Sequence, residues 1–286
     1  MLFDLQSPGR RRVIKVAYAT LAVLFVVGFV GFGVGSEAGV GGIADVFSGG
    51  GGDDDNPFEE EIEAAETRAE QNPKDPAAFA ELVQLHYQAG TQAVEIDEET
   101  GQQSLSETGE RRLQQGADAW AKYQKLSGQK VDTSTATLAV QTYAALGDAA
   151  LAGALSSGSA QEALSGAEDA VADWAEAAEA QQILMAARPT ASGYSNLAFF
   201  HYRSGQITEG DRATQQAVAL AKGAEKEQIS QQLQQTKQEG ERLADGVAQL
   251  RKAEQAGAAG GDNPLDLGGG GGLGGGLGGG GGLSAP

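Results

Sequence analysis

Apolar residues recur at helical spacing along most of this chain. The pattern is simplest near the C-terminus, where the positions alternate four and three residues apart: Ile229, Leu233, Thr236, Gly240, Leu243, Val247 and Leu250. From residue 56 to 256 the chain is rich in Ala, Gln, Glu and Leu and poor in Val and Ile, a composition that favours helix. We therefore expect an all-α protein.

An uninterrupted apolar run near the N-terminus predicts a membrane-spanning helix. Residues 16–36 carry no charge and match the roughly 20 residues that a helix needs to cross a bilayer. Four basic residues precede the run: Arg10, Arg11, Arg12 and Lys15. The next basic residue after the run is Arg68. By the positive-inside rule, we expect residues 1–12 in the cytoplasm, a single-pass helix over 13–36 in the cytoplasmic membrane, and the rest outside.

A cleaved export signal is the alternative interpretation of this segment. The basic cluster loosely resembles a twin-arginine signal, and residues 36–38 offer a cleavage site. Against this, the apolar run is longer than a usual signal core and no clean A-x-A sequence follows it. Gly31 and Gly35 also form a GxxxG spacing that permits dimerisation of membrane helices, although this motif is short and frequent.

Glycine-rich segments flank the helical region. We expect residues 37–55 to form a flexible Gly/Asp-rich linker, and residues 257–286, mostly Gly and Leu, to be disordered. Asn56 and Pro57 predict the start of the first helix, with the acidic residues around them complementing the helix dipole. A calcium site at residues 53–55 is disfavoured because the D-x-D-x-D-G ligand spacing is missing.

Two distant stretches carry the same spaced pattern. Each has an aromatic residue, a leucine, a His-Tyr pair and a glycine: Phe79, Leu82, His86, Tyr87 and Gly90, then Tyr194, Leu197, His201, Tyr202 and Gly205. Tyr143 and Gly147 mark a degenerate copy between them, with Gly147 lying 57 residues after Gly90 and 58 before Gly205. The chain is therefore expected to contain repeated helical units.

These residues resemble the tetratricopeptide repeat family, whose two-helix units stack into a solenoid. The resemblance covers residues 56–222 and implies about three divergent units. Because their spacing exceeds the 34 residues of a standard unit, the excess is expected between the paired helices of the first two units, near residues 96–110 and 155–166. The second helices of these units would then span 111–126 and 167–187.

Residues 223–256 are expected to form a capping helix that closes the apolar end of the solenoid. The seven-position stripe described above would face the preceding helices. A self-associating coiled coil, and with it a homodimer, is the alternative, although Thr236 and Gly240 weaken the stripe for that purpose.

Composition removes several classes of function. The chain has no cysteine, and its formal net charge is −19, with +3 on residues 1–15 and −22 on the remainder; nucleic acid is therefore not expected as a partner. The two histidines, His86 and His201, share a repeat position, which indicates packing rather than catalysis or metal binding. With no phosphate loop, nucleophile elbow or HExxH motif, we expect no catalytic, metal or cofactor site and no enzyme activity.

The resemblance implies a concave groove lined by the first helix of each unit. Carried over by position, its residues are Gln84, Tyr87 and Gln88 in unit one, Thr137 and Gln141 in unit two, and Ser195, Phe199, Tyr202 and Arg203 in unit three. Aromatic side chains there suit a peptide segment, and Arg203 is able to pair with a carboxylate. The alternative for Tyr87 and Tyr202 is packing against neighbouring helices.

The sequence thus predicts a membrane-anchored extracytoplasmic module that binds another protein or a peptide segment, as a scaffold or adaptor. The alternative is an ancillary chaperone of the export machinery, because the layout of basic start, one membrane helix and helical repeats resembles translocon-associated proteins of the YfgM and PpiD type. An envelope enzyme is disfavoured because the catalytic motifs are missing.

Overall fold

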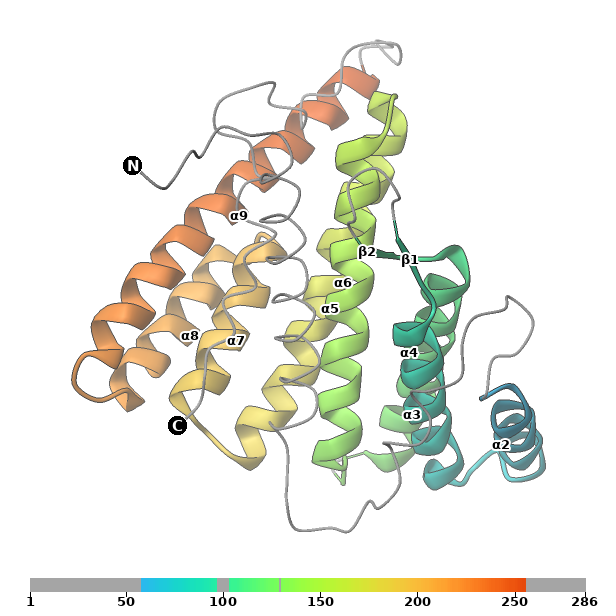
Figure 1. Cartoon of the computed structure of the whole chain (residues 1–286). Helices are drawn as coiled ribbons and strands as arrows, with labels where there is room; N and C mark the ends of the chain where they lie inside the picture. The colour runs from blue at the N-terminus through green and yellow to red at the C-terminus, as the bar shows by residue number, and fades with distance from the viewer. Residues whose placement is uncertain (1–57, 97–102, 129, 256–286) are drawn as a thin grey trace, which may run out of the picture. The chain divides into compact units, whose positions relative to one another are not determined.

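The computed structural model describes residues 58–96, 103–128 and 130–255. Within them lie eight helices and two short paired strands (Figure 1): α2 (Glu59–Gln71), α3 (Pro76–Gln92), β1 (Val94–Ile96), β2 (Gln103–Leu105), α4 (Glu107–Ser127), α5 (Thr133–Ser156), α6 (Ala160–Ala187), α7 (Ala191–Arg203), α8 (Ile207–Leu220) and α9 (Glu225–Gln255). The expected anchor at 13–36, the linker at 37–55 and the tail at 257–286 lie outside the described residues. The all-α expectation is confirmed.

The helices pack in adjacent pairs. The most extensive contacts join α5 with α6, α3 with α4, and α7 with α8, while α2 packs on α3 and each pair contacts the next. Each of these three pairs joins helices that are consecutive in the chain. Their boundaries place Phe79 and His86 on α3, Tyr143 on α5, and Tyr194 and His201 on α7.

Local capping chemistry sets several helix boundaries. The Asp75 carboxylate accepts a hydrogen bond from the amide of Ala77 at 3.0 Å, and Pro76 occupies the first position of α3. Helix α6 ends at Ala187, before Arg188 and Pro189, as expected. At α2 the helix begins at Glu59 instead of at the expected Pro57, and Phe58 stands at the cap position without a side-chain capping bond; three glutamates in the first turn complement the dipole instead.

The excess length of the second unit lies in its helices. Helices α5 and α6 contain 24 and 28 residues, against 13 and 14 for α7 and α8. The added turns bury apolar side chains at their contact, including Leu151, Ala154 and Leu164. Among the described residues α5 is also the one helix long and apolar enough to cross a membrane, and it is an internal, partly buried element of this packing.

Helix α9 covers the last pairs of helices. It contacts α6, α7 and α8, and its expected stripe is buried: Ile229, Leu233, Thr236, Gly240, Leu243, Val247 and Leu250. Ion pairs at its edges join Lys237 to Asp211 at 2.8 Å and Arg251 to Glu168 at 2.6 Å. The apolar stripe of α9 is therefore buried within the described structure.

Candidate functional site

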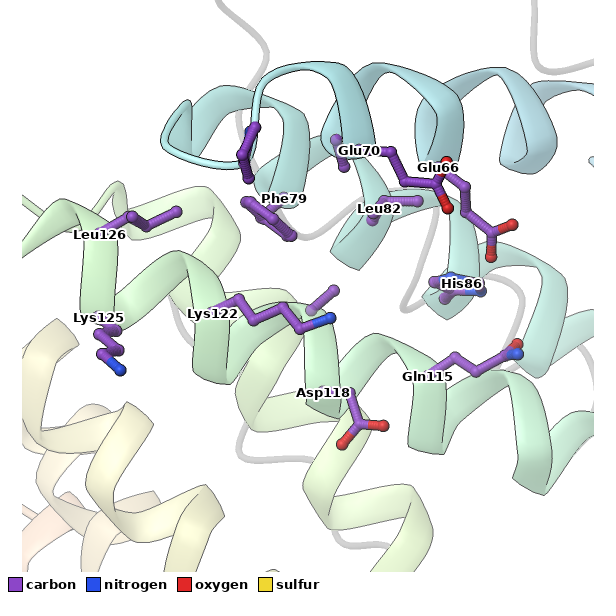
Figure 2. A pocket seen from close by; sticks show the side chains of 13 residues that line it. Glu66, Glu70, Phe79, Leu82, His86, Gln115, Asp118, Lys122, Lys125 and Leu126 are labelled. Carbon is purple, nitrogen blue, oxygen red and sulfur yellow. The ribbon is translucent and has the colours of Figure 1, made fainter.

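An open groove of about 770 Å³ lies between α2, α3 and α4 (Figure 2). We call it the α2–α4 groove, and its lining is Glu66, Ala69, Glu70, Pro73, Phe79, Leu82, His86, Gln115, Asp118, Ala119, Lys122, Lys125 and Leu126. The residues from α3 and α4 recur three, four or seven positions apart, so each helix contributes one face. The volume falls in the range of ordinary ligand sites.

The floor of the groove is apolar. Phe79 and Leu82 lie on consecutive turns of α3 and are buried, with Ala69 and Ala119 beside them. Leu126 closes one end, and 37% of its surface is exposed, although large apolar side chains are otherwise mostly buried in the described residues. Exposed apolar surface in a hollow marks a place where another apolar group gains by binding.

Charged side chains form the rim. Glu66 and Glu70 project from α2, while Asp118, Lys122 and Lys125 project from α4, and all five are exposed. Figure 2 shows the two glutamates toward the His86 end, and Lys125 beside Leu126 at the opposite end. The Lys122 ammonium reaches over the groove and lies 5.8 Å from the centre of the Phe79 ring.

His86 lies at the polar end of the groove. Its side chain is only 3% exposed, and its Nδ1 atom has no hydrogen-bond partner in the described structure. Burial lowers the pKa of His86 to about 4, with a further lowering by Arg112 and a smaller opposing effect of Glu59. The imidazole is therefore neutral at physiological pH.

Arg112 organises the same end. Its guanidinium forms an ion pair with Glu59 of α2 and donates a hydrogen bond from Nη1 to the Gln115 Oε1 atom at 3.1 Å. The Arg112 Nε atom is buried without a partner among the described residues. Arg112 thus ties α2 to α4 beside His86, and Gly116 lets α4 approach α3 there, since a Cβ atom at 116 would lie 3.3 Å from the His86 Cβ.

The residues expected to line a concave groove fall into two groups. Gln84 and Gln141 are exposed, and Tyr87, Gln88, Thr137 and Phe199 are partly buried. The other three, Ser195, Tyr202 and Arg203, are buried at 1%, 2% and 8% exposure. None of the nine lines the α2–α4 groove, which lies on a different face of α3 from Gln84 and Gln88.

Tyr202 and Arg203, which were expected to line a groove, contact other side chains inside the protein. The Tyr202 hydroxyl donates to Asp211 Oδ1 at 2.9 Å and lies 2.9 Å from the Thr214 hydroxyl. The Arg203 guanidinium stacks 4.7 Å from the Trp174 ring and 5.1 Å from the Phe199 ring. Helices α6, α8 and α9 pack against α7 and bury Tyr202 and Arg203. The spacing of residues within α7 does not reveal this burial.

Both histidines are buried, in keeping with the packing interpretation of the repeated position. His201 is 4% exposed, and its Nδ1 atom lies 2.8 Å from Gln206 Oε1. It borders a smaller hollow of about 390 Å³ whose other lining includes Gln124 and Glu179. The equivalence does not extend to hydrogen bonding, since His86 lacks such a partner at Nδ1 in the described structure.

A second hollow, of about 480 Å³, lies between α4, α5 and α6 and is acidic. It contains Glu107, Glu110, Asp169 and Asp173, and burial together with Asp169 and Glu176 raises the pKa of Asp173 to about 7. Across the described ranges, no group of three or more His, Cys, Asp or Glu side chains is arranged to hold a metal ion. We therefore take the α2–α4 groove, which combines apolar floor and charged rim, as the candidate site.

Comparison of this chain with models of protein families, with curated proteins and with solved structures gives no match in any of the three.

Proposed function

We propose that this chain is a protein-interaction module that binds a segment of a partner protein in the α2–α4 groove. The observation that carries this proposal is the open groove of about 770 Å³ between three helices, which has the buried Phe79 and Leu82 in its lining and the exposed Leu126 at one end. Helical-repeat proteins commonly bind partners in surfaces of this kind.

The geometry of the groove favours a peptide segment over a small molecule. Its floor follows two turns of α3, and its charged groups stand along both walls instead of converging on one point. A segment with an apolar ridge would cover Phe79, Leu82 and Leu126 while its polar side chains meet the rim. Covering the apolar surface that stays exposed in the groove, chiefly that of Leu126, would favour binding by roughly 25 cal/mol per Å².

The cellular setting remains part of the proposal. The anchor expected at residues 13–36, the cytoplasmic location of residues 1–12 and the extracytoplasmic location of the helical region rest on the sequence pattern. An ancillary role in protein export is the narrower version of this function. Identification of the translocon among bound partners would favour it, whereas one fixed envelope partner would favour a scaffold or adaptor.

Two exposed leucines allow a matched test. Leu126 borders the groove, whereas Leu220, at the end of α8, is similarly exposed at 43% and lies outside it. A photo-crosslinking amino acid would replace each leucine in turn in the full chain, expressed in native membranes. We expect a discrete crosslinked partner from position 126 and none from 220, and Leu126→Glu should abolish capture of that partner when Leu220→Glu does not.

Capture from position 220 equal to that from 126, or unchanged binding by Leu126→Glu, would contradict the groove assignment. Because both leucines are exposed, neither substitution should unfold the protein. Circular dichroism of the purified variants would check that the helices are retained.

A further inference from the structure

The charges on the rim of the α2–α4 groove form no ion pairs within the described structure, and the Lys122 ammonium lies over the Phe79 ring. Glu66, Glu70, Asp118, Lys122 and Lys125 take part in none of the ion pairs there, although neighbouring charges do. Arg68 pairs with Glu81 at 2.6 Å between α2 and α3, and Arg112 pairs with Glu59 between α4 and α2. The charges that join the helices are thus paired, whereas those that face the groove are in no ion pair of the described structure.

These charges are separated along the groove by sign. Glu66 and Glu70 stand toward the His86 end and Lys125 stands beside Leu126 at the other end, while Asp118 and the Lys122 ammonium lie between them (Figure 2). Asp118 and Lys125 are seven positions apart on α4, which corresponds to roughly 10 Å along the helix. A bound segment would therefore meet opposite potentials about two helical turns apart.

The polar end is suited to a cation. The groups that line this end are Glu66 and Glu70 on α2, His86 on α3 and Gln115 on α4, with the ion pair of Arg112 and Glu59 beside them. The single positive charge in this set, on Arg112, is already paired with Glu59. Because burial keeps His86 neutral, the imidazole adds no repulsion to an approaching ammonium or guanidinium group.

We infer that the α2–α4 groove selects a partner segment with a Lys or Arg at the His86 end, apolar residues over Phe79 and Leu82, and an Asp or Glu at the Leu126 end. This inference rests on the proposed function of the groove and specifies its ligand. The cation pairs with Glu66 and Glu70, and the anion pairs with Lys122 and Lys125. The apolar floor supplies affinity, and the two charged ends supply selection.

Three synthetic peptides would test the charge pattern. Each would be about four helical turns long, with the same apolar residues, and the charged ends would be Lys and Glu, Lys and Lys, or Glu and Glu. Binding to the purified full chain would be measured by fluorescence anisotropy at low salt. Since exposed pairs contribute modestly, we expect the mixed peptide to lose about fivefold in affinity when one end of the groove is reversed.

Charge reversals in the protein separate the specific effect from the overall negative charge of the chain. Lys122→Glu with Lys125→Glu should weaken the mixed peptide and strengthen the Lys-only peptide. Glu66→Lys with Glu70→Lys should weaken the mixed peptide and strengthen the Glu-only peptide. Combining all four substitutions in one protein should restore binding of the mixed peptide, which then lies in the groove in the opposite direction. Glu227→Lys with Glu254→Lys, both exposed on α9 and away from the groove, is the control for Glu66→Lys with Glu70→Lys, because both pairs change the net charge by +4.

The outcomes distinguish a failure of the charge inference from a failure of the proposed function. If all three peptides bind equally and Leu126→Glu abolishes their binding, the groove is a docking site and the charge inference is overturned. If the α9 control shifts binding as much as the groove reversals, the charge inference is likewise overturned. If Leu126→Glu changes nothing, the proposed function itself fails.

Discussion

The backbone carbonyl of Tyr202 lies directly against Gly240, where α9 passes over α7. A Cβ atom at position 240 would clash with this carbonyl oxygen. Gly240 therefore marks the closest approach of the two helices, although in the sequence it only weakens the apolar stripe of α9. Van der Waals contact at this point lets Leu233 and Leu243, on either side, reach the interior.

Replacing Gly240 should loosen α9. We expect Gly240→Ala to lower the free energy of unfolding by about 2 kcal/mol, because the obstructing atom is backbone and cannot rotate away. Gly153→Ala on α5 is the matched control: a Cβ atom there would meet nothing within 4 Å, so alanine should stabilise the helix by up to about 1 kcal/mol. Urea unfolding followed by circular dichroism would measure both, and equal effects would contradict the close approach.

His86 should make stability depend on pH. Its pKa falls from 6.5 in the unfolded chain to about 4 in the folded one, so its contribution is complete above about pH 6.5 and is lost as the pH falls toward 4. The expected loss at pH 5 is about 2 kcal/mol. Urea unfolding at pH 7 and pH 5 would measure it, and His86→Asn should reduce the difference.

Direct titration offers an independent check on His86. The chain has two histidines, whose ring protons can be followed by NMR from pH 8 to pH 4, with His201→Asn assigning the signals. Both pKa values should lie below 6.5, since burial lowers each of them. A pKa near 6.5 for His86 would mean that the imidazole is not buried as described.

Arg203 should stabilise the helices by stacking. Its guanidinium is planar and lies on Trp174 and Phe199, a geometry that the ammonium of lysine does not reproduce. We expect Arg203→Lys to cost about 1 kcal/mol or more and to change the fluorescence of Trp174. The exposed Arg212→Lys should do neither, and an equally silent Arg203→Lys would argue against the stacking.

Tyr202→Phe tests whether the tyrosine is structural. It removes the hydroxyl that bonds to Asp211 and Thr214 and should lower stability by about 1 kcal/mol. Peptide binding in the α2–α4 groove should remain unchanged, because Tyr202 is buried beneath α8 and α9. Tyr194→Phe, on the same helix but with no side-chain hydrogen bond in the described structure, is the control. Loss of peptide binding in Tyr202→Phe alone would return the tyrosine to a ligand-binding role.

Local sequence signals located most of the helix boundaries. Asp75 with Pro76 begins α3, and the stop before Pro189 ends α6, because caps and prolines act through bonds within a few residues. The start of α2 was shifted by two residues, since three glutamates complement its first turn without a side-chain cap. Residues 155–166 were expected to form a loop or helix extensions, and most of them are helical in the structure, where α5 ends at Ser156 and α6 begins at Ala160.

The candidate site was much less accessible to sequence reasoning. Periodicity placed Phe79, Leu82 and His86 on one face of α3, yet a face covered by a neighbouring helix and a face left open share the same spacing. The separation of α2 from α4, which opens the groove, depends on where the helices cross and on contacts such as that between Gly116 and His86. Similarly, Tyr202 and Arg203 occupy positions that suit a groove but are enclosed by α6, α8 and α9.

The sequence by itself determined the helical class and the apolar stripe of α9, because these depend on short-range periodicity and capping. Only the tertiary structure decided which polar residues are buried and which apolar residues remain exposed. Those properties depend on how closely the helices pack against one another, and the groove between α2, α3 and α4 arises from this packing.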